Sequence, residues 1–224
     1  DALRNPLKGL QLGLKYVFKR NGLLSTPSAT IQAMIKSDNN LKSPDIKIQL
    51  IHLSEKGRFG VAHDSGLEKF PGFSIGAYQL FPKSLGSVHI QSNKYDAPPI
   101  IKPNYFDHPD DIDTTLKALK VARNVADQPA LKSLIVDELR PGKEISKDID
   151  LIEYIRETGQ TTYHPIGTCK MGIDKLSVVD PELKVHGIEN LRIIDASVMP
   201  ILVSSNTNAA AIMIGEKAAD IILK

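Results

Sequence analysis

The spacing of apolar residues changes along the chain, and this change limits the folds that the chain can form. Between residues 46 and 105, apolar side chains alternate with polar ones or form short runs bounded by Gly and Pro, as in β-strands. The runs lie at residues 46–50, 74–81, 88–91 and 100–105. From Asp107 onward, apolar residues recur mainly at helical spacing. Strands followed by helices predict an α+β fold, with a mostly antiparallel sheet over about residues 40–160 and helices on one face.

Three helices are predicted in the later part of the chain. The first begins at His108-Pro109-Asp110-Asp111, where acidic groups favour a helix N-terminus, and continues to Ala126. The second follows Ser146 and ends at Gly159, and the third covers about residues 208–223. The side chains expected to face inward are Ile149, Ile152 and Ile155 in the second helix and Ile212, Ile214, Ala218 and Ile222 in the third.

Two further segments complete this outline. Residues 1–45 read as an irregular or helical lead-in, in which Asn21-Gly22 ends a mildly amphipathic stretch. A short apolar strand is expected at Leu191–Ile194, directly before a loop and the last helix.

Charge and hydropathy exclude two classes of partner. Lys and Arg together number 28 and Asp and Glu 26, so the net charge is only +2. A surface that binds nucleic acid needs a clear basic excess. The longest apolar runs, such as residues 209–214, are far shorter than the roughly 20 residues of a membrane-spanning helix. We therefore expect no nucleic-acid partner and no membrane span.

The sequence does not support a serine hydrolase, a metal site or a dinucleotide-binding fingerprint. Gly72-Phe73-Ser74-Ile75-Gly76 matches the G-x-S-x-G pattern of serine hydrolases, but that motif needs a strand before the serine and a helix after it. Here a strand is expected after Ser74, so the serine marks a strand start. The 6 histidines include no pair at helical i, i+4 spacing, and we expect no metal site. The dinucleotide fingerprint G-x-G-x-x-G does not occur in these residues.

Three segments after residue 160 carry possible chemistry. His164 is followed by Pro165 and Gly167, which favour a constrained loop, and histidine often serves as a general base near neutral pH. The apolar run before Asp195-Ala196-Ser197 is typical of a strand that ends at a ligand crevice. The polar residues 204–208 precede an apolar helix, whose N-terminus can be capped by them or can bind an anion. Taken alone, His164 is better explained as an ordinary loop histidine, and a simple helix cap is the structural alternative for residues 204–208.

Taken in order, the segments YHPIGTCKMG, VVDPELKVHGIENLRIIDAS and SSNTNAAAIMIGEKAADII resemble the C-terminal part of the glucose-methanol-choline (GMC) family of flavin oxidoreductases. Insect glucose dehydrogenase-like members look nearest. Residues 82–88 and 103–105 resemble the substrate-domain motifs of the family more weakly, with Leu85 where the family more often carries Arg. The resemblance implies a substrate-binding domain at residues 1–160. It also implies, at residues 161–224, a catalytic loop and the last strand and helix of a Rossmann-like FAD domain.

The resemblance also implies a role for individual residues. The catalytic base of the family corresponds to His164, and its partner corresponds to Asn206. The implied contacts with the cofactor FAD are Asp195 and Ala196 near the pyrophosphate and ribitol, and Thr207 and Asn208 near the pyrimidine edge of the flavin. The implied reaction is the oxidation of a small-molecule alcohol, such as a sugar, by hydride transfer to the flavin.

Three interpretations follow. Family members are more than twice as long and begin with an FAD-binding domain that carries the G-x-G-x-x-G fingerprint. In the first interpretation, the chain is the C-terminal portion of such an enzyme, inactive alone, and its partner is the N-terminal FAD-binding half. In the second, it is a binding module that has lost FAD. In the third, it is an unrelated hydrolase built on Ser74. The insect resemblance favours an extracellular location, while the alcohol and the electron acceptor are left open.

Overall fold

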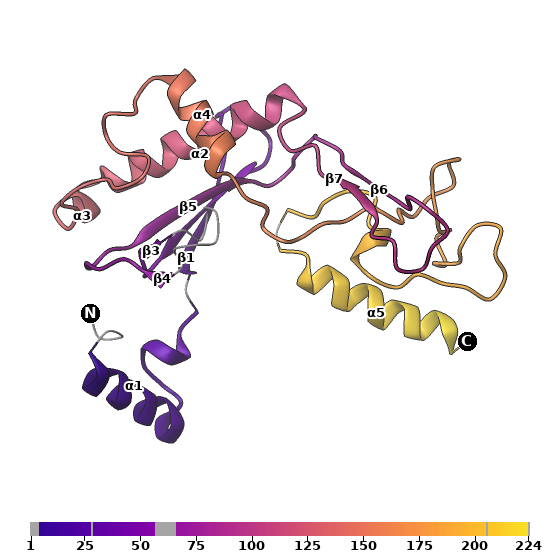
Figure 1. Ribbon diagram of the computed structural model, residues 1–224, viewed down its shortest axis with the longest axis horizontal. Helices are drawn as coiled ribbons and strands as arrows, with labels where there is room; N and C mark the ends of the chain where they lie inside the picture. Colours follow the sequence, from indigo (N-terminus) through magenta and orange to yellow (C-terminus); the bar gives the residue numbers. More distant parts are fainter. Residues whose placement is uncertain (1–4, 28, 57–65, 205, 224) are drawn as a thin grey trace. The chain divides into compact units, whose positions relative to one another are not determined.

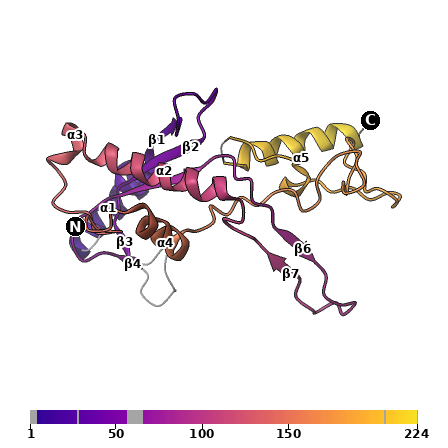
Figure 2. The same ribbon diagram turned by 90° about the horizontal axis from the view of Figure 1, so that it is seen from above.

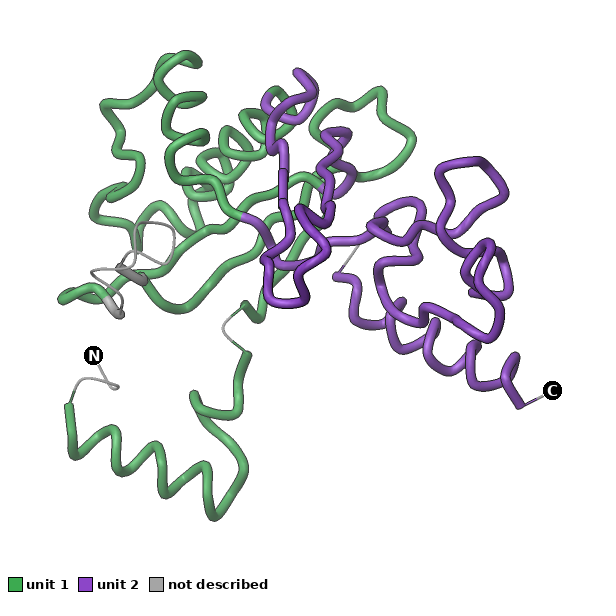
Figure 3. Tube along the Cα trace, turned by 45° about the vertical axis from the view of Figure 1, so that its right-hand side comes forward, with its two compact units in different colours: residues 1–79, 113–160 green, residues 80–112, 161–224 purple. Residues whose placement is uncertain are grey.

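The computed structural model describes residues 5–27, 29–56, 66–204 and 206–223. It confirms an α+β fold with antiparallel sheets (Figure 1). The chain forms two compact units, which are Asp1–Gln79 with Asp113–Gln160 and Leu80–Ile112 with Thr161–Lys224 (Figure 3). The sequence analysis expected a substrate-binding domain at 1–160 and a catalytic and FAD-domain segment at 161–224. The two compact units are defined by contacts and not by what they bind, so those domains stay a prediction. Among the described residues, no helix is both long and apolar enough to cross a membrane.

The first unit is built on a three-stranded antiparallel sheet in the order β1-β2-β5. Its strands are β1 (Ala29–Ile35), β2 (Ile46–Ile51) and β5 (Ser74–Gln79). The central strand β2 buries Ile46, Ile48 and Ile51, because it has a neighbour on each side. The strands predicted at 46–50 and 74–81 are confirmed. A further pair, β3 (Glu55–Lys56) and β4 (Gly66–Leu67), forms a small antiparallel sheet.

The strand β1 lies in the segment that was expected to be an irregular or helical lead-in, so that expectation is wrong there. β1 is an edge strand, and only its two end residues are even half-buried. An exposed edge strand has little need of an alternating apolar face, which is the signal that predicts strands. The same lead-in does contain the helix α1 (Pro6–Lys19), whose C-cap Arg20 has a left-handed φ of 50° just before Asn21-Gly22. A single-turn 3-10 helix, η1 (Leu23–Ser25), follows.

Two helices lie over one face of the sheet in both ribbon views (Figures 1 and 2). These are α2 (Pro109–Ala126) and α4 (Asp148–Thr158), and the short α3 (Pro129–Lys132) lies between them in sequence. Both long helices were predicted. Of the residues expected to face inward in α4, Ile155 is buried and Ile152 is half-buried, which agrees with the prediction. Ile149 is 70% exposed, and the buried Leu151 was not predicted. Residues four apart share one face of a helix, and the contacted face is that of 151 and 155.

The second unit contains the hairpin of β6 (Ser87–His89) and β7 (Ile100–Lys102), which confirms two short predicted strands. It also contains the 3-10 turn η2 (Ala196–Val198) and the last helix α5 (Asn208–Ile222). Its hydrophobic core is formed by Val179, Leu183, Val198, Met199, Ile214 and Ala218. Of the expected inward residues of α5, Ile214 and Ala218 are confirmed, whereas Ile212 and Ile222 are exposed.

The strand expected at Leu191–Ile194 does not form. Arg192 makes one isolated antiparallel bridge to Lys184, and Ile193 N donates to Leu183 O at 3.1 Å. These contacts bind the segment to the loop just before it, and within the described part of the chain no longer strand pairs with it. A strand needs such a partner along its length, and apolar composition alone does not supply one.

Candidate active site

His164 and Asn206 are brought together at the start of α5. The side-chain amide nitrogen of Asn206 lies 2.8 Å from His164 Nε2. The next residue, Thr207, places its Oγ1 at 3.1 Å from His164 Nδ1. Asn206 is exposed, His164 is half-buried and Thr207 is buried. Two consecutive residues therefore engage both ring nitrogens of one histidine.

The chemistry of these groups determines which ring nitrogen is basic. A neutral imidazole has one N–H donor and one acceptor nitrogen. An amide nitrogen can only donate, so Nε2 accepts from Asn206 and the ring proton lies on Nδ1. Nδ1 then donates to Thr207 Oγ1. The lone pair of Nε2, which is the group that can take up a proton, is directed at the exposed Asn206 amide.

Backbone contacts attach the loop of His164 to the rest of the second unit. Cys169 N donates to Ser197 O at 3.1 Å, and Met171 N donates to Val198 O at 2.8 Å. Gly167 has a φ of +80°, a left-handed conformation that glycine adopts without the steric cost of a side chain. Val198 and Ile214 belong to the same core cluster, so the segments that carry His164 and Asn206 share one packed support.

The other predicted cofactor contacts lie at the ends of η2 and α5. Asp195 is the N-cap of η2, where its carboxylate accepts from Ser197 N at 2.7 Å. Ala196 begins η2, and the exposed Asn208 begins α5. The role of Asp195, Ala196, Thr207 and Asn208 in binding FAD stays a prediction.

The N-terminus of α5 fits the FAD that the resemblance implies. Thr207 is its N-cap, but no side-chain capping bond from it is found in the described structure, and its hydroxyl contacts His164. The first turn also holds no acidic residue. A helix N-terminus carries partial positive charge and outward-facing N–H groups, which suit an anionic group such as a reduced flavin or a phosphate.

The contact between Thr207 and His164 was missed by sequence reasoning, which assigned Thr207 to the flavin alone. The only sequence signal for this contact was the position of Thr207 directly after Asn206, the predicted partner of His164. A threonine before a helix ordinarily caps that helix, and no local pattern shows that its hydroxyl turns toward a distant residue instead.

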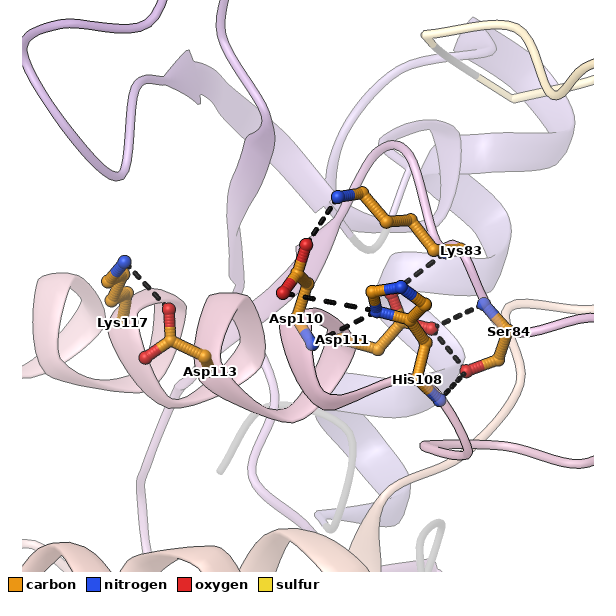
Figure 4. A network of polar contacts seen from close by, with 7 residues as sticks. All are labelled: Lys83, Ser84, His108, Asp110, Asp111, Asp113 and Lys117. Carbon is orange, nitrogen blue, oxygen red and sulfur yellow. Dashed lines mark hydrogen bonds and ion pairs between the residues drawn. The ribbon is translucent and has the colours of Figure 1, made fainter.

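A second polar cluster centres on Asp111, in the first turn of α2 (Figure 4). This carboxylate is buried and accepts from the backbone N of Lys83 and of Ser84, each at 2.8 Å, and from the Ser84 hydroxyl. Burial raises the pKa of Asp111, but the hydrogen bonds from Ser84 and Lys83 outweigh it and hold the pKa below its usual value. These hydrogen bonds hold residues 83–84 against the first turn of α2, and we interpret the cluster as stabilising the fold. The neighbouring Leu85 is 81% exposed.

Ser74 shows the strand start that its sequence context predicts. It is the first residue of β5, and its hydroxyl donates to Leu53 O at 3.1 Å. A nucleophilic serine stands between a strand and a helix, and here a strand follows instead. The geometry at Ser74 is therefore that of a sheet residue.

A comparison with known families gives one match for this chain. A family model described as GMC oxidoreductase matches residues 82–215, more than half of the chain. The chain belongs to the GMC oxidoreductase family.

Particular relatives agree with this assignment. The chain is 37% identical over 220 residues to an alcohol dehydrogenase [acceptor] of Pseudomonas putida, which covers 97% of this chain and 38% of that protein. It is 34% identical over 212 residues to an oxygen-dependent choline dehydrogenase of Klebsiella pneumoniae, covering 95% of this chain and 37% of that protein. The crystal structure of pyridoxine 4-oxidase from Mesorbium loti superposes with a TM-score of 0.73 at 27% identity, covering 84% of this chain and 36% of that one. The chain thus spans less than two fifths of the length of these relatives.

Proposed function

We propose that this chain supplies the catalytic pair of an FAD-dependent enzyme that oxidises a CH–OH group, with His164 as the base and Asn206 as its partner. The observation that carries the proposal is the 2.8 Å contact between Asn206 Nδ2 and His164 Nε2 in a chain of the GMC family. The names of the relatives support it, because they act as alcohol dehydrogenase, choline dehydrogenase and pyridoxine 4-oxidase.

The two side chains offer one donor and one acceptor to a hydroxyl group. A substrate hydroxyl that enters between them replaces their direct contact, so that its oxygen accepts from Asn206 Nδ2 and its hydrogen is donated to His164 Nε2. Nε2 takes this proton while the carbon–hydrogen bond is broken. Nδ1 continues to donate to Thr207, which keeps the ring in place while it becomes positively charged. Positioned proton transfer of this kind contributes a factor of about 10²–10⁴ to the rate.

FAD, when bound, supplies the two-electron acceptor for this oxidation. The residues that would hold it are Asp195, Ala196, Thr207 and Asn208. They lie at the starts of η2 and α5, and the backbone N–H groups at the N-terminus of α5 can bind an anionic part of the cofactor. The partner that would complete the cofactor site is an N-terminal FAD-binding half, as the resemblance implies.

The proposal also covers the branch of the family, the substrate class and the location of the protein. The resemblance of the three ordered segments after residue 160 supports an insect glucose dehydrogenase-like member that oxidises a sugar and is extracellular. An enzyme of this branch should reduce its flavin faster with glucose than with choline, pyridoxine or a simple primary alcohol. Equal or slower reduction by glucose would remove the sugar assignment while leaving alcohol oxidation intact.

The test of the catalytic pair is His164→Ala in the full-length protein. Stopped-flow absorbance should show flavin reduction by the best alcohol slowed by about 10²–10⁴-fold, because the proton acceptor is gone. His186→Ala is the matched control, because His186 is an exposed histidine of the same unit that contacts Gly172 O at 3.0 Å. Reduction of H164A at the wild-type rate would refute the role of His164. A full-length protein that binds no FAD would instead support the non-catalytic binding module.

A further inference from the structure

We propose that Thr207 is a positioning residue for His164: its hydroxyl holds the ring in one orientation and in the tautomer that leaves Nε2 free to accept a proton. This inference rests on the proposed function. Its geometric basis is the 3.1 Å distance between Thr207 Oγ1 and His164 Nδ1 and the burial of Thr207, whose exposed fraction is 6%.

In the described structure, the side chain of Thr207 makes no capping hydrogen bond to α5. A threonine at a helix N-cap usually accepts a hydrogen bond from an amide of the first turn. The backbone of Thr207 is already helical, with φ of −75° and ψ of −8°, whereas a residue that caps a helix with its side chain is usually extended. The hydroxyl contacts the histidine instead.

The contacts of Asn206 and Thr207 together restrain the His164 ring more than either contact alone. A single hydrogen bond at Nε2 favours the tautomer with the proton on Nδ1, but it leaves that proton without an acceptor and leaves the imidazole less restrained in its rotation about the bond to Cβ. Asn206 requires Nε2 to accept, and Thr207 accepts the proton that Nδ1 must then carry. When Nε2 takes a proton from the substrate, the bond from Nδ1 to Thr207 becomes charge-assisted and stronger. The hydroxyl thus acts on the proton transfer through His164.

The ring tautomer can be measured without any catalysis. In the full-length protein labelled with ring-¹⁵N histidine, with His164→Gln used to identify the signals, we expect neutral His164 to be protonated on Nδ1. Thr207→Val keeps the side-chain volume and removes the hydroxyl, and should raise the population protonated on Nε2. Thr207→Ser keeps the hydroxyl and should retain the wild-type tautomer. Thr207→Ala is measured in parallel, so that a folding defect in T207V does not leave the tautomer undetermined.

The kinetic test separates positioning from simple packing. T207V should lower the rate constant of flavin reduction at saturating alcohol by about tenfold, while KM changes much less, because orientation of the base and not substrate binding is lost. T207S should restore most of this rate. Thr168→Val is the matched control, because it removes an exposed hydroxyl from the loop of His164 and should change neither measurement.

The outcomes distinguish this inference from the proposed function. A wild-type tautomer in T207V and T207A, or a T207S variant as slow as T207V, would overturn the role of Thr207. Full activity of H164A would refute the catalytic pair, and the tautomer result would then stand as a property of the folded chain alone.

Discussion

At the scale of single residues, Gly86 occupies a position that excludes any side chain. A Cβ atom added there would lie 2.5 Å from Lys102 O and 2.9 Å from Pro103 O, which are backbone atoms at the end of β7. The pairing of Ser87 with Lys102 holds these backbones together. The contact is therefore relieved only by distorting the β6–β7 hairpin.

We expect Gly86→Ala to lower the free energy of unfolding by about 1–3 kcal/mol, as overpacking typically does. Gly215→Ala is the control, because a Cβ there meets nothing within 4 Å and alanine favours the helical conformation of α5. That variant should gain about 0.5–1 kcal/mol. Urea unfolding followed by circular dichroism measures both, and a G86A protein as stable as wild type would contradict the steric argument.

Asp111 provides a prediction with a defined pH dependence. Its carboxylate has a lowered pKa in the folded protein because the hydrogen bonds from Ser84 and Lys83 outweigh the effect of burial. A lowered pKa in the folded state means that the ionised group contributes stability above its ordinary pKa of about 3.8. This contribution is lost as the pH falls through the lower, folded-state pKa.

Asp111→Asn should therefore cost about 1–3 kcal/mol of unfolding free energy at pH 7, because an amide N–H₂ then faces backbone donors. The difference from wild type should shrink as the pH falls below 3.8. Asp113→Asn is the control, since it removes only an exposed i, i+4 ion pair with Lys117, which contributes about 0.5 kcal/mol or less. Chemical denaturation from pH 7 to pH 3 tests the sign, and a difference that grows on acidification would refute it.

At the scale of elements, Arg123 joins the end of α2 to the segment that leads to α4. Its guanidinium pairs with Glu138 at 2.9 Å and donates to Ile145 O at 2.8 Å and to Gly142 O at 2.9 Å. Both charged side chains are about three-quarters buried, so water does not readily replace these bonds. Lysine cannot reproduce this planar arrangement of donors.

Arg123→Lys should destabilise the protein by about 1–3 kcal/mol, because buried acceptors lose their donors. Lys120→Gln is the matched control on the same helix, since Lys120 forms an exposed pair with Asp148 at 2.6 Å. Exposed pairs contribute about 0–1 kcal/mol. Thermal unfolding of the two variants compares them directly, and equal effects would show that Arg123 acts only as a surface charge.

The elements that the sequence predicted best are those with local signals. Two strands of the sheet, β2 and β5, show the expected runs, while α2 and α4 show helical spacing and clear ends. Two failures are the edge strand β1, which was missed, and the strand expected at 191–194, which does not form. In both, the outcome depends on which distant segment lies alongside, and a local pattern does not contain that information.

At the scale of the whole molecule, the chain spans less than two fifths of the length of the three relatives compared above, and it carries no G-x-G-x-x-G fingerprint. The 224-residue chain alone is therefore expected to show no flavin absorption after it is mixed with FAD and desalted. The physical reason is that the proposed contacts, at the α5 N-terminus and at Asp195, would reach only part of the cofactor. Absorption spectra before and after desalting decide this, and a retained flavin spectrum would show that these residues suffice.

The sequence by itself determined the fold class, the family and the candidates His164 and Asn206, because periodicity and ordered motifs are local properties of the chain. The tertiary structure decided that Asn206 and Thr207 meet the two nitrogens of the same ring, and that Asp111 is buried beneath residues 83–84. These contacts join positions far apart in sequence. A hydroxyl or carboxylate can satisfy its hydrogen bonds with several partners, and only the packed chain determines which of them lies within reach.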